Sequence, residues 1–171
     1  YIKYKIKDSD EYITIATTRP ETMFGDSAIA VNPADERYIN MIGKIVIIPI
    51  ANREIKIISD EYVDKNFGTG ALKITPAHDP NDYKIGQRYN LEFINILNNN
   101  GTLNDRTGND FNGLTVLKAR EKIISKLQKE NLITKIDPIT HSVGHCYRCS
   151  TIIEPLISEQ WFIDVNKKIK S

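Results

Sequence analysis

The chain has 171 residues, of which 40% are hydrophobic, and a formal net charge of +1 at pH 7. This length allows one domain with a buried core, and the balanced charge excludes a strongly basic, tail-driven nucleic-acid binder, although RNA binding through a local basic patch stays open. There is no apolar run of about 20 residues, as a membrane span requires, and two cysteines are too few for a disulfide framework, so we expect a cytoplasmic domain without membrane contact.

The first third of the chain predicts strands. It opens on a strand-like segment, Tyr1–Lys7, and short β-branched runs bounded by turn residues follow. Asn32-Pro33 supplies an N-cap and a first-turn proline, which predicts a helix ending near Gly43. The predicted strands of this part are Tyr12–Thr18, Ala28–Val31, Lys44–Ile50 and Glu54–Ile58.

The rest of the chain alternates strands and helices. Strands are predicted at Ala71–Thr75 and Phe93–Leu97, and Asp79-Pro80 predicts a helix that runs to about Arg88. A longer helix is predicted at about Thr115–Asn131. Its expected apolar face consists of Val116, Leu117, Ile123, Ile124 and Leu127.

These elements predict the fold class. Many short strands favour a small barrel or rolled sheet over a doubly wound parallel sheet. We expect an α+β fold with a small β-barrel-like core of short strands and a few peripheral helices. No linker or repeat divides the chain, and neither end tapers into a polar tail, so we expect residues 1–171 to form a single domain excised from a longer protein.

The first polar motif is Ala16-Thr17-Thr18-Arg19-Pro20-Glu21-Thr22. A strand ends there at a proline, and the turn presents one arginine and several hydroxyl groups from a short segment. Taken alone, this is also what an ordinary exposed strand end looks like.

The second motif is Phe67-Gly68-Thr69-Gly70-Ala71-Leu72-Lys73-Ile74-Thr75. Gly-x-Gly permits positive φ and lets a backbone approach a ligand closely, although one such pattern is weak evidence. In the strand that follows, alternation places Lys73 and Thr75 on the same face.

The third motif, Thr75-Pro76-Ala77-His78-Asp79-Pro80-Asn81-Asp82-Tyr83, places two carboxylates in the first turn of a helix. Asp79 as an N-cap and Asp82 as a partner of the helix dipole would account for both without any ligand. Because a helix N-terminus favours ionised carboxylates, we expect Asp79 and Asp82 to bind a cation or accept hydrogen bonds, and not to act as a protonated acid.

Taken in order, these motifs, together with MFGDSAIAVNP, THSVGHCYRC and EPLISEQWF, resemble the editing insertion of valyl-tRNA synthetases, in the class I aminoacyl-tRNA synthetase family. The resemblance covers essentially the whole chain. It implies an aminoacyl-tRNA deacylase that removes threonine from tRNA(Val), and possible action on threonyl-adenylate, with no cofactor for editing. It also implies two partners, the 3′ end of the misacylated tRNA and the rest of the synthetase, and we expect a monomer.

The resemblance also implies roles for individual residues. Asp82 would bind the α-amino group of the misattached amino acid, while Asp79 and Thr75 would line the pocket for its side chain; which aspartate reads which group stays open. The terminal adenosine, its ribose and the ester region would be held by Arg19, Thr22, Phe67 and Lys73, with Thr17 and Thr18 lining the same pocket. His78 would be only a neighbour.

A polar pocket suits this discrimination. A hydrophobic synthetic site rejects threonine in favour of valine by only about 10²-fold. A second pocket of carboxylates and hydroxyls would reverse the preference, because valine would leave those groups unpaired. We expect hydrolysis by a water molecule, with Asp82 holding the ammonium and Thr75 or Lys73 orienting the ester or its water, because no Ser-His-Asp arrangement is visible.

Cys146 and Cys149 form one C-x-x-C, which is half of a structural zinc site. The resemblance implies that a second pair would lie outside this chain, so zinc is expected only in the full-length protein. His141 or His145 could substitute as ligands, and two unbound thiols remain the simpler interpretation.

Three other functions remain open from the sequence. One is a non-catalytic module that docks the acceptor end of tRNA, which would need Arg19, Phe67 and Lys73 but not the two aspartates. Another is the editing domain of an isoleucyl-type synthetase, whose pocket would have to admit valine. A sugar hydrolase fits poorly, because its two carboxylates stand about 5–9.5 Å apart and usually on different elements.

Overall fold

The computed structural model describes residues 1–140 and 142–163. Six strands form one sheet in the order β2-β1-β4-β5-β3-β6. Neighbouring strands are antiparallel except β3 and β5, which are parallel. The edge strands β2 and β6 contact each other, so the sheet curls into a nearly closed barrel. The strands are β1 (Ile2–Ile6), β2 (Tyr12–Ile15), β3 (Ala28–Val31), β4 (Ile45–Ile47), β5 (Glu54–Ser59) and β6 (Ala71–Ile74). The predicted α+β fold with a barrel-like core is confirmed.

Strand β3 separates two apolar cores. It is buried along its whole length because it has a strand on each side and is covered on both faces. Ile29 and Val31 face the larger core, whereas Ala28 and Ala30 face a smaller one. The small alanine side chains leave room for the helix α1 (Pro80–Arg88), whose Ile85 packs into the smaller core.

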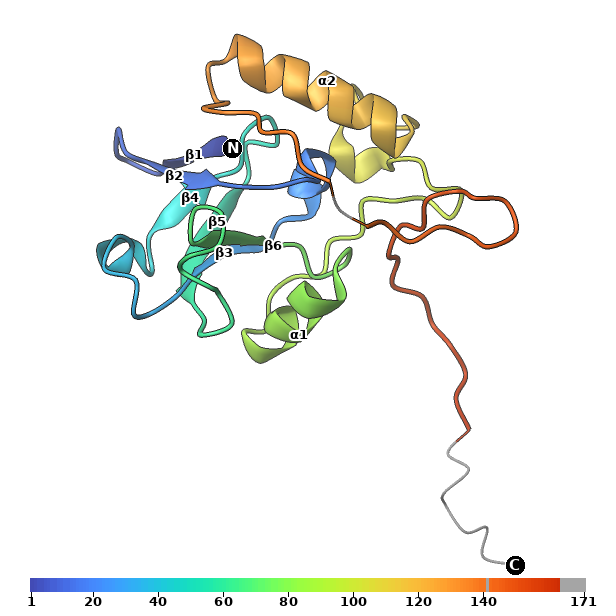
Figure 1. Cartoon of the computed structure of the whole chain (residues 1–171), viewed down its shortest axis with the longest axis horizontal. Coiled ribbons are helices and arrows are strands. Elements are labelled where there is room, and N and C mark those ends of the chain that lie inside the picture. Colours follow the sequence, from blue (N-terminus) through green and yellow to red (C-terminus); the bar gives the residue numbers. More distant parts are fainter. Residues whose placement is uncertain (141, 164–171) are drawn as a thin grey trace, which may run out of the picture.

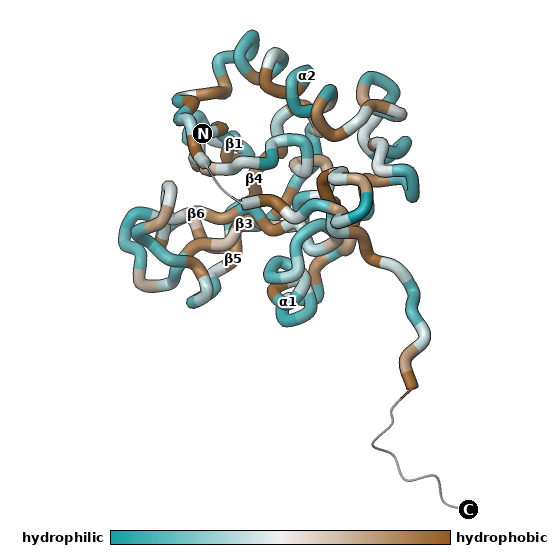
Figure 2. The backbone as a smooth tube through the Cα atoms, turned by 45° about the vertical axis from the view of Figure 1, so that its right-hand side comes forward, coloured by the Kyte–Doolittle hydropathy of each residue, from teal (hydrophilic) through white to brown (hydrophobic). Residues whose placement is uncertain are grey.

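The second helix, α2 (Val116–Lys129), lies across the top of the sheet in Figure 1 and alternates between hydrophilic and hydrophobic residues along its length (Figure 2). The helix prediction is confirmed, but its apolar face is corrected. Leu117 is exposed and Ile124 only half-buried, and Ala119 takes a buried position instead. A 3.6-residue period brings positions 116, 119, 123 and 127 to one side, and Leu117 lies off that line.

Two predicted elements are wrong. Residues 32–43 form turns with one short 3₁₀ segment, η2 (Ile39–Met41), because the side chains of Asn32 and Asp35 accept the N–H groups of Ala34 and Arg37. Such side-chain bonds compete with a continuous helix. Residues 93–97 form no strand, since Ile96 donates its N–H to His78 and only Leu97 makes an isolated bridge.

Two further 3₁₀ segments complete the regular structure, η1 (Pro20–Gly25) and η3 (Asp105–Thr107). Residues 142–163 contain no helix; the chain returns to the domain at Glu154 and Pro155 and then leads away from it (Figure 1), and Trp161 is fully exposed. No helix among the described residues is both long and apolar enough to cross a membrane.

Candidate functional site

The end of β6 carries two interacting polar side chains. Lys73 Nζ donates to Thr75 Oγ1 at 2.7 Å, so the two residues share one face, as strand alternation predicted. Both are buried. Lys73 Nζ also donates to Thr22 Oγ1 at 2.7 Å. The first and second sequence motifs therefore meet here, although Thr22 and Lys73 are 51 positions apart.

Sequence reasoning missed the carboxylate at the centre of this cluster, Asp26, which is 0% exposed. Its Oδ1 accepts from Lys73 Nζ at 2.9 Å and from Thr75 Oγ1 at 2.7 Å, and its Oδ2 accepts from Tyr4 Oη at 2.9 Å. Burial and the neighbouring Asp26 raise the pKa of Tyr4 well above its usual value of 10.0, so Tyr4 keeps its proton. The sequence signal that could have indicated Asp26 was the Gly25-Asp26 pair at the end of η1.

Close packing of η1 against β6 lets Asp26 reach the cluster. A Cβ at Gly25 would lie 3.0 Å from Thr75 Cγ2 and 3.0 Å from the carbonyl oxygen of Ile94. Only glycine permits this approach without displacing a neighbour. The close packing around Thr75 therefore requires glycine at position 25, directly before Asp26.

The first turn of α1 adds two carboxylates. Asp79 caps the helix as predicted, because its Oδ1 accepts the N–H groups of Asn81 and Asp82. Asp82 is buried, and its Oδ2 accepts the Thr75 N–H at 2.8 Å, which joins α1 to the end of β6. This N–H is the one partner that the described residues give its side chain.

The expectation of a readily ionised carboxylate needs correction for Asp82. Burial raises its pKa from 3.8 to about 6, and the Thr75 N–H and the charge of Lys73 offset only part of that effect. The helix dipole argument ignored desolvation. Asp82 is charged mainly above about pH 6, and then it is a buried anion to which no basic side chain of residues 1–140 or 142–163 is bonded.

Arg19 lies between η1 and the start of α1. Its Nη1 donates to the His78 carbonyl oxygen at 3.0 Å, and its Nη2 pairs with Glu154. Its backbone N–H donates to Thr17 Oγ1 at 3.0 Å. Arg19 thus links the first sequence motif to the third, which contains His78. The sequence predicted that these two motifs belong to one site.

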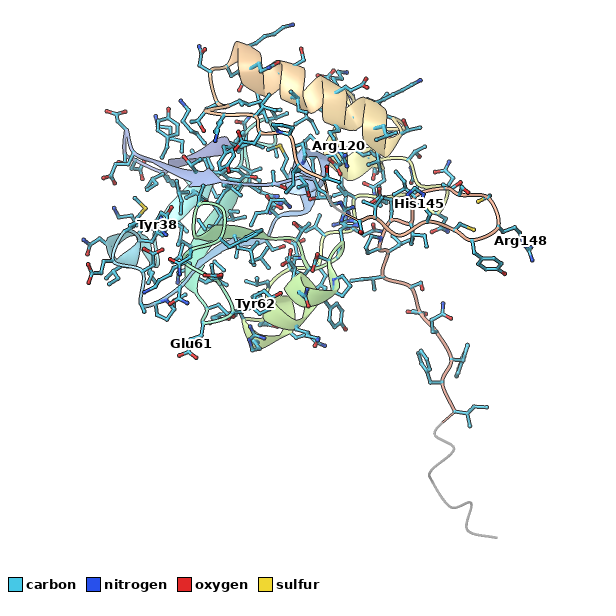
Figure 3. All side chains as sticks on the ribbon, in the orientation of Figure 1. Tyr38, Glu61, Tyr62, Arg120, His145 and Arg148 are labelled. Atoms are coloured by element: carbon cyan, nitrogen blue, oxygen red, sulfur yellow. The ribbon has the colours of Figure 1, made fainter. Side chains whose placement is uncertain are left out.

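Glu21, beside Arg19, is the buried partner of a second arginine. Arg120 of α2, labelled in Figure 3, donates to both of its carboxylate oxygens at 2.8 Å. This bidentate ion pair holds η1 against α2. Sequence analysis missed it, because the two residues lie 99 positions apart.

His78 has a structural role. Ile96 donates its N–H to Nε2 at 2.9 Å, so the ring proton is on Nδ1, which donates to the Pro155 carbonyl oxygen at 3.1 Å. Burial lowers the pKa of His78 from 6.5 to about 4, so the ring is neutral at physiological pH. With both nitrogens occupied, His78 cannot act as a general base here.

Phe67 and Thr18 stand apart from the buried cluster. Phe67 is 78% exposed, and Thr18 is also exposed. The loop carrying Phe67 packs closely against the first motif, because a Cβ at Gly68 would lie 3.1 Å from the Ala16 Cβ. Gly68 and Gly70 both have positive φ, as the Gly-x-Gly pattern predicted.

The two cysteines lie on a separate loop. Cys146 N–H donates to Thr151 O at 2.8 Å, and the pKa of the Cys149 thiol is lowered by its hydrogen bond with the Thr151 side chain. Within residues 1–140 and 142–163, no three His, Cys, Asp or Glu side chains gather as a metal site would require. His145 bonds to Ser150 O, and His141 lies outside the described residues. Zinc in a longer protein stays a prediction.

The site therefore combines a buried polar cluster with a more exposed rim. The cluster consists of Thr22, Asp26, Lys73, Thr75 and Asp82. The cluster holds two carboxyl groups and one lysine, a charge balance that would favour a further positive group once Asp82 is ionised, above about pH 6. Arg19, Thr17, Thr18 and Phe67 lie toward the rim, where a larger ligand could extend.

Comparison with known proteins identifies relatives. Residues 37–128 match the family model described as leucyl-tRNA synthetase, editing domain. The chain is 55% identical over 170 residues to the valine–tRNA ligase of Thermotoga maritima, and this alignment covers 99% of this chain and 20% of that protein. It is 57% identical over 163 residues to the valine–tRNA ligase of Petrotoga mobilis, covering 95% of this chain and 18% of that protein. The chain thus spans about a fifth of the length of these relatives.

Solved structures share the fold. The ternary complex of Agrobacterium radiobacter K84 agnB2 LeuRS with tRNA and LeuAMS superposes with a TM-score of 0.60 at 24% identity, over 77% of this chain and 19% of that one. The structure of GlLeuRS-CP1 gives a TM-score of 0.56 at 15% identity, over 75% of this chain and 85% of that one. At these identities the likeness extends to the fold alone.

Proposed function

Because the chain belongs to the family of aminoacyl-tRNA synthetase editing domains, we propose that it hydrolyses the ester of a misacylated tRNA, with threonyl-tRNA(Val) as its substrate. The observation that carries this proposal is the buried polar cluster around Thr75. A pocket built from carboxylates and hydroxyls suits threonine and penalises valine, which would leave buried polar groups unpaired at about 1–3 kcal/mol each.

Asp82 is proposed to bind the α-ammonium group of the substrate. It is buried and, above about pH 6, carries a charge that no basic side chain among the described residues neutralises by a direct bond. An ammonium ion placed there would supply the missing counter-charge. Asp79, one turn away and half-buried, is proposed with Thr75 to line the pocket for the substrate side chain.

The proposed reaction is direct attack by water. Water adds to the ester carbonyl carbon, the bond from that carbon to the ribose oxygen breaks, and a water proton ends on the ribose oxygen. The products are threonine and tRNA with a free hydroxyl. His78 is fully bonded and no other described histidine lies in the cluster, so catalysis is proposed to come from orientation. Asp82 fixes the ammonium, and Thr75 or Lys73 positions the ester or its water.

The rim is proposed to hold the end of the tRNA. Arg19 lies beside Thr22 of the cluster, Thr17 and Thr18 lie on the same turn as Arg19, and exposed Phe67 could stack on the terminal adenine. The 3′ end of tRNA(Val) and the remainder of the synthetase are the proposed partners. A monomeric state and a cytoplasmic location stay predictions.

Selective deacylation tests the proposal. Threonyl-tRNA(Val), valyl-tRNA(Val) and alanyl-tRNA are incubated with the chain, and release of each amino acid is followed by acid precipitation. We expect threonine to be released at least about 10²-fold faster than valine, since editing must outweigh the poor discrimination of a hydrophobic site. Rapid loss of valine with threonine spared would point to an isoleucyl-type pocket, and tRNA binding without any hydrolysis to a docking module.

Phe67→Ala is expected to raise KM for threonyl-tRNA about tenfold with little change in kcat, because one stacked base contributes about 1–3 kcal/mol. Thermal stability should not change, since the side chain is 78% exposed. Tyr147→Ala is the matched control: that ring is 94% exposed but lies on the cysteine loop. Equal KM values for wild type and Phe67→Ala would remove Phe67 from the tRNA site.

A further inference from the structure

The hydrogen bonds of the buried cluster have a fixed direction that starts at Lys73. A lysine ammonium has three hydrogens and no lone pair. Lys73 Nζ donates to Thr22 Oγ1 at 2.7 Å, to Asp26 Oδ1 at 2.9 Å and to Thr75 Oγ1 at 2.7 Å. All three hydrogens are therefore used inside the protein. Any direct contact from Lys73 to a ligand would have to replace one of these bonds.

The two threonine hydroxyls are directed in the same way. Each has a single hydrogen and two lone pairs. Thr75 Oγ1 donates its hydrogen to Asp26 Oδ1 at 2.7 Å, and Thr22 Oγ1 donates to the Arg19 carbonyl oxygen at 3.0 Å. Each hydroxyl also accepts one bond from Lys73. What remains for a ligand is a lone pair on each hydroxyl, and no hydrogen.

Asp26 is the group that imposes this direction on Thr75. An ionised carboxylate can only accept hydrogen bonds, so Thr75 must act as the donor between them. Asp26 is held in place by Tyr4, which donates to its second oxygen at 2.9 Å, and by Arg53, which donates to its backbone carbonyl oxygen. The carboxylate is completely buried and cannot itself reach a ligand.

We propose that Asp26 is a positioning residue that makes the pocket around Thr75 accept hydrogen bonds only, and thereby selects an amino acid whose side chain donates one. Threonine has such a hydrogen on its side-chain hydroxyl, and valine and 2-aminobutyrate have none. This inference rests on the proposed function for the nature of the ligand, a threonine ester. It adds Asp26 as the residue that creates the preference for threonine without touching the ligand.

Binding of two non-hydrolysable analogues tests the proposal. The probes are adenosines that carry threonine or 2-aminobutyrate through an amide on the ribose; they differ only in the hydroxyl. For the wild-type chain, calorimetry should give a Kd about tenfold lower for the threonine analogue, the value of one hydrogen bond. In Asp26→Leu the ratio should fall to about one, because leucine has a similar size but accepts no hydrogen bond, so the Thr75 hydrogen is free to turn toward the ligand.

A double-mutant cycle shows whether Asp26 acts through Thr75. Thr75→Val should abolish the ratio, and adding Asp26→Leu should then change it no further. A general structural defect would instead weaken both analogues equally and leave the ratio near ten. Asp60→Leu is the matched control: Asp60 is also buried and paired with a basic side chain, Arg88, and its side-chain hydrogen bonds among the described residues go to Arg88 and the Tyr62 N–H, outside the cluster. It should keep the wild-type ratio.

The outcomes separate this inference from the proposed function. If the chain hydrolyses threonyl-tRNA selectively but Asp26→Leu keeps a tenfold ratio, the role of Asp26 is refuted and the function stands. If the analogues bind with the expected ratio but no ester is hydrolysed, the deacylase proposal fails and the role of Asp26 stands. Should Asp26→Leu not fold, Tyr4→Phe loosens the same carboxylate, and a ratio reduced about twofold to threefold is expected; an unchanged ratio refutes the inference.

Discussion

Asp82→Asn is expected to make the fold more stable and to remove most of its deacylase activity. Asparagine keeps the shape of the side chain, and its amide oxygen can still accept the Thr75 N–H. It loses the charge proposed to hold the substrate ammonium. Removing one partner of a buried charged pair costs about 2–5 kcal/mol of binding, so kcat/KM should fall by about 10² to 10³-fold.

The gain in stability follows from the raised pKa of Asp82. In the unfolded chain this carboxyl ionises near pH 3.8, and in the folded chain near pH 6. Below pH 3.8 it is protonated in both states and costs nothing. Between pH 3.8 and 6 the unfolded state releases its proton first, so wild-type stability falls as pH rises, and above pH 6 the penalty is constant at roughly 3 kcal/mol at most. Asp82→Asn should therefore be more stable at pH 8 and no more stable at pH 3.5.

Urea unfolding at the two pH values measures this difference. Asp79→Asn is the matched control, because it changes a half-buried carboxylate in the same turn while asparagine caps a helix as well as aspartate does. It should show no stability gain that depends on pH. An Asp82→Asn variant with unchanged deacylation would contradict the proposal that Asp82 binds the ammonium. Lower stability of this variant at pH 8 would contradict the conclusion that its buried charge destabilises the fold.

Local sequence patterns predicted those parts of the site that depend on neighbouring residues. Alternation along a strand placed Lys73 and Thr75 on one face, and the Asp-Pro pair placed Asp79 at the N-terminus of α1. The same kind of reasoning failed at residues 32–43, where Asn32 and Asp35 bond to nearby N–H groups and stop the helix. A capping signal alone does not show that a helix continues.

The rest of the site depends on contacts between distant segments, which no local pattern contains. Asp26 meets Tyr4 across 22 positions and Lys73 across 47, through the order of strands in the sheet. The burial of Asp82, and with it the rise of its pKa, also requires the fold. The resemblance to synthetase editing domains was confirmed because it uses several ordered motifs, whereas the roles of single residues stay predictions.

Both central groups of the site are costly to the fold, in different ways. Asp82 is a buried carboxylate to which no cationic side chain of the described residues is bonded, and the proposed substrate ammonium would relieve that cost. Asp26 is a buried carboxylate whose cost is met permanently by Lys73, Thr75 and Tyr4. Neutralising Asp82 should therefore stabilise the fold, whereas removing the Lys73 charge beside Asp26 should destabilise it.

Lys73→Met is accordingly expected to destabilise the fold by about 3–5 kcal/mol, the usual cost of leaving one member of a buried ion pair alone. Methionine fills a similar volume, so the loss comes from the charge and the three hydrogen bonds and not from a cavity. Denaturant midpoints at constant slope would measure it. Lys7→Met, which breaks the exposed pair with Glu54, is the control and should leave the midpoint unchanged.

The double variant Lys73→Met/Asp26→Asn decides the cause. If the uncompensated charge of Asp26 is responsible, neutralising it should restore at least half of the lost stability, so the two changes together cost less than Lys73→Met alone. A double variant that is less stable than either single one would mean that the hydrogen bonds, and not the charge, hold the cluster together. In that case the cluster would be a polar core of the barrel, and its link to selectivity would rest on the direction of the Thr75 hydroxyl alone.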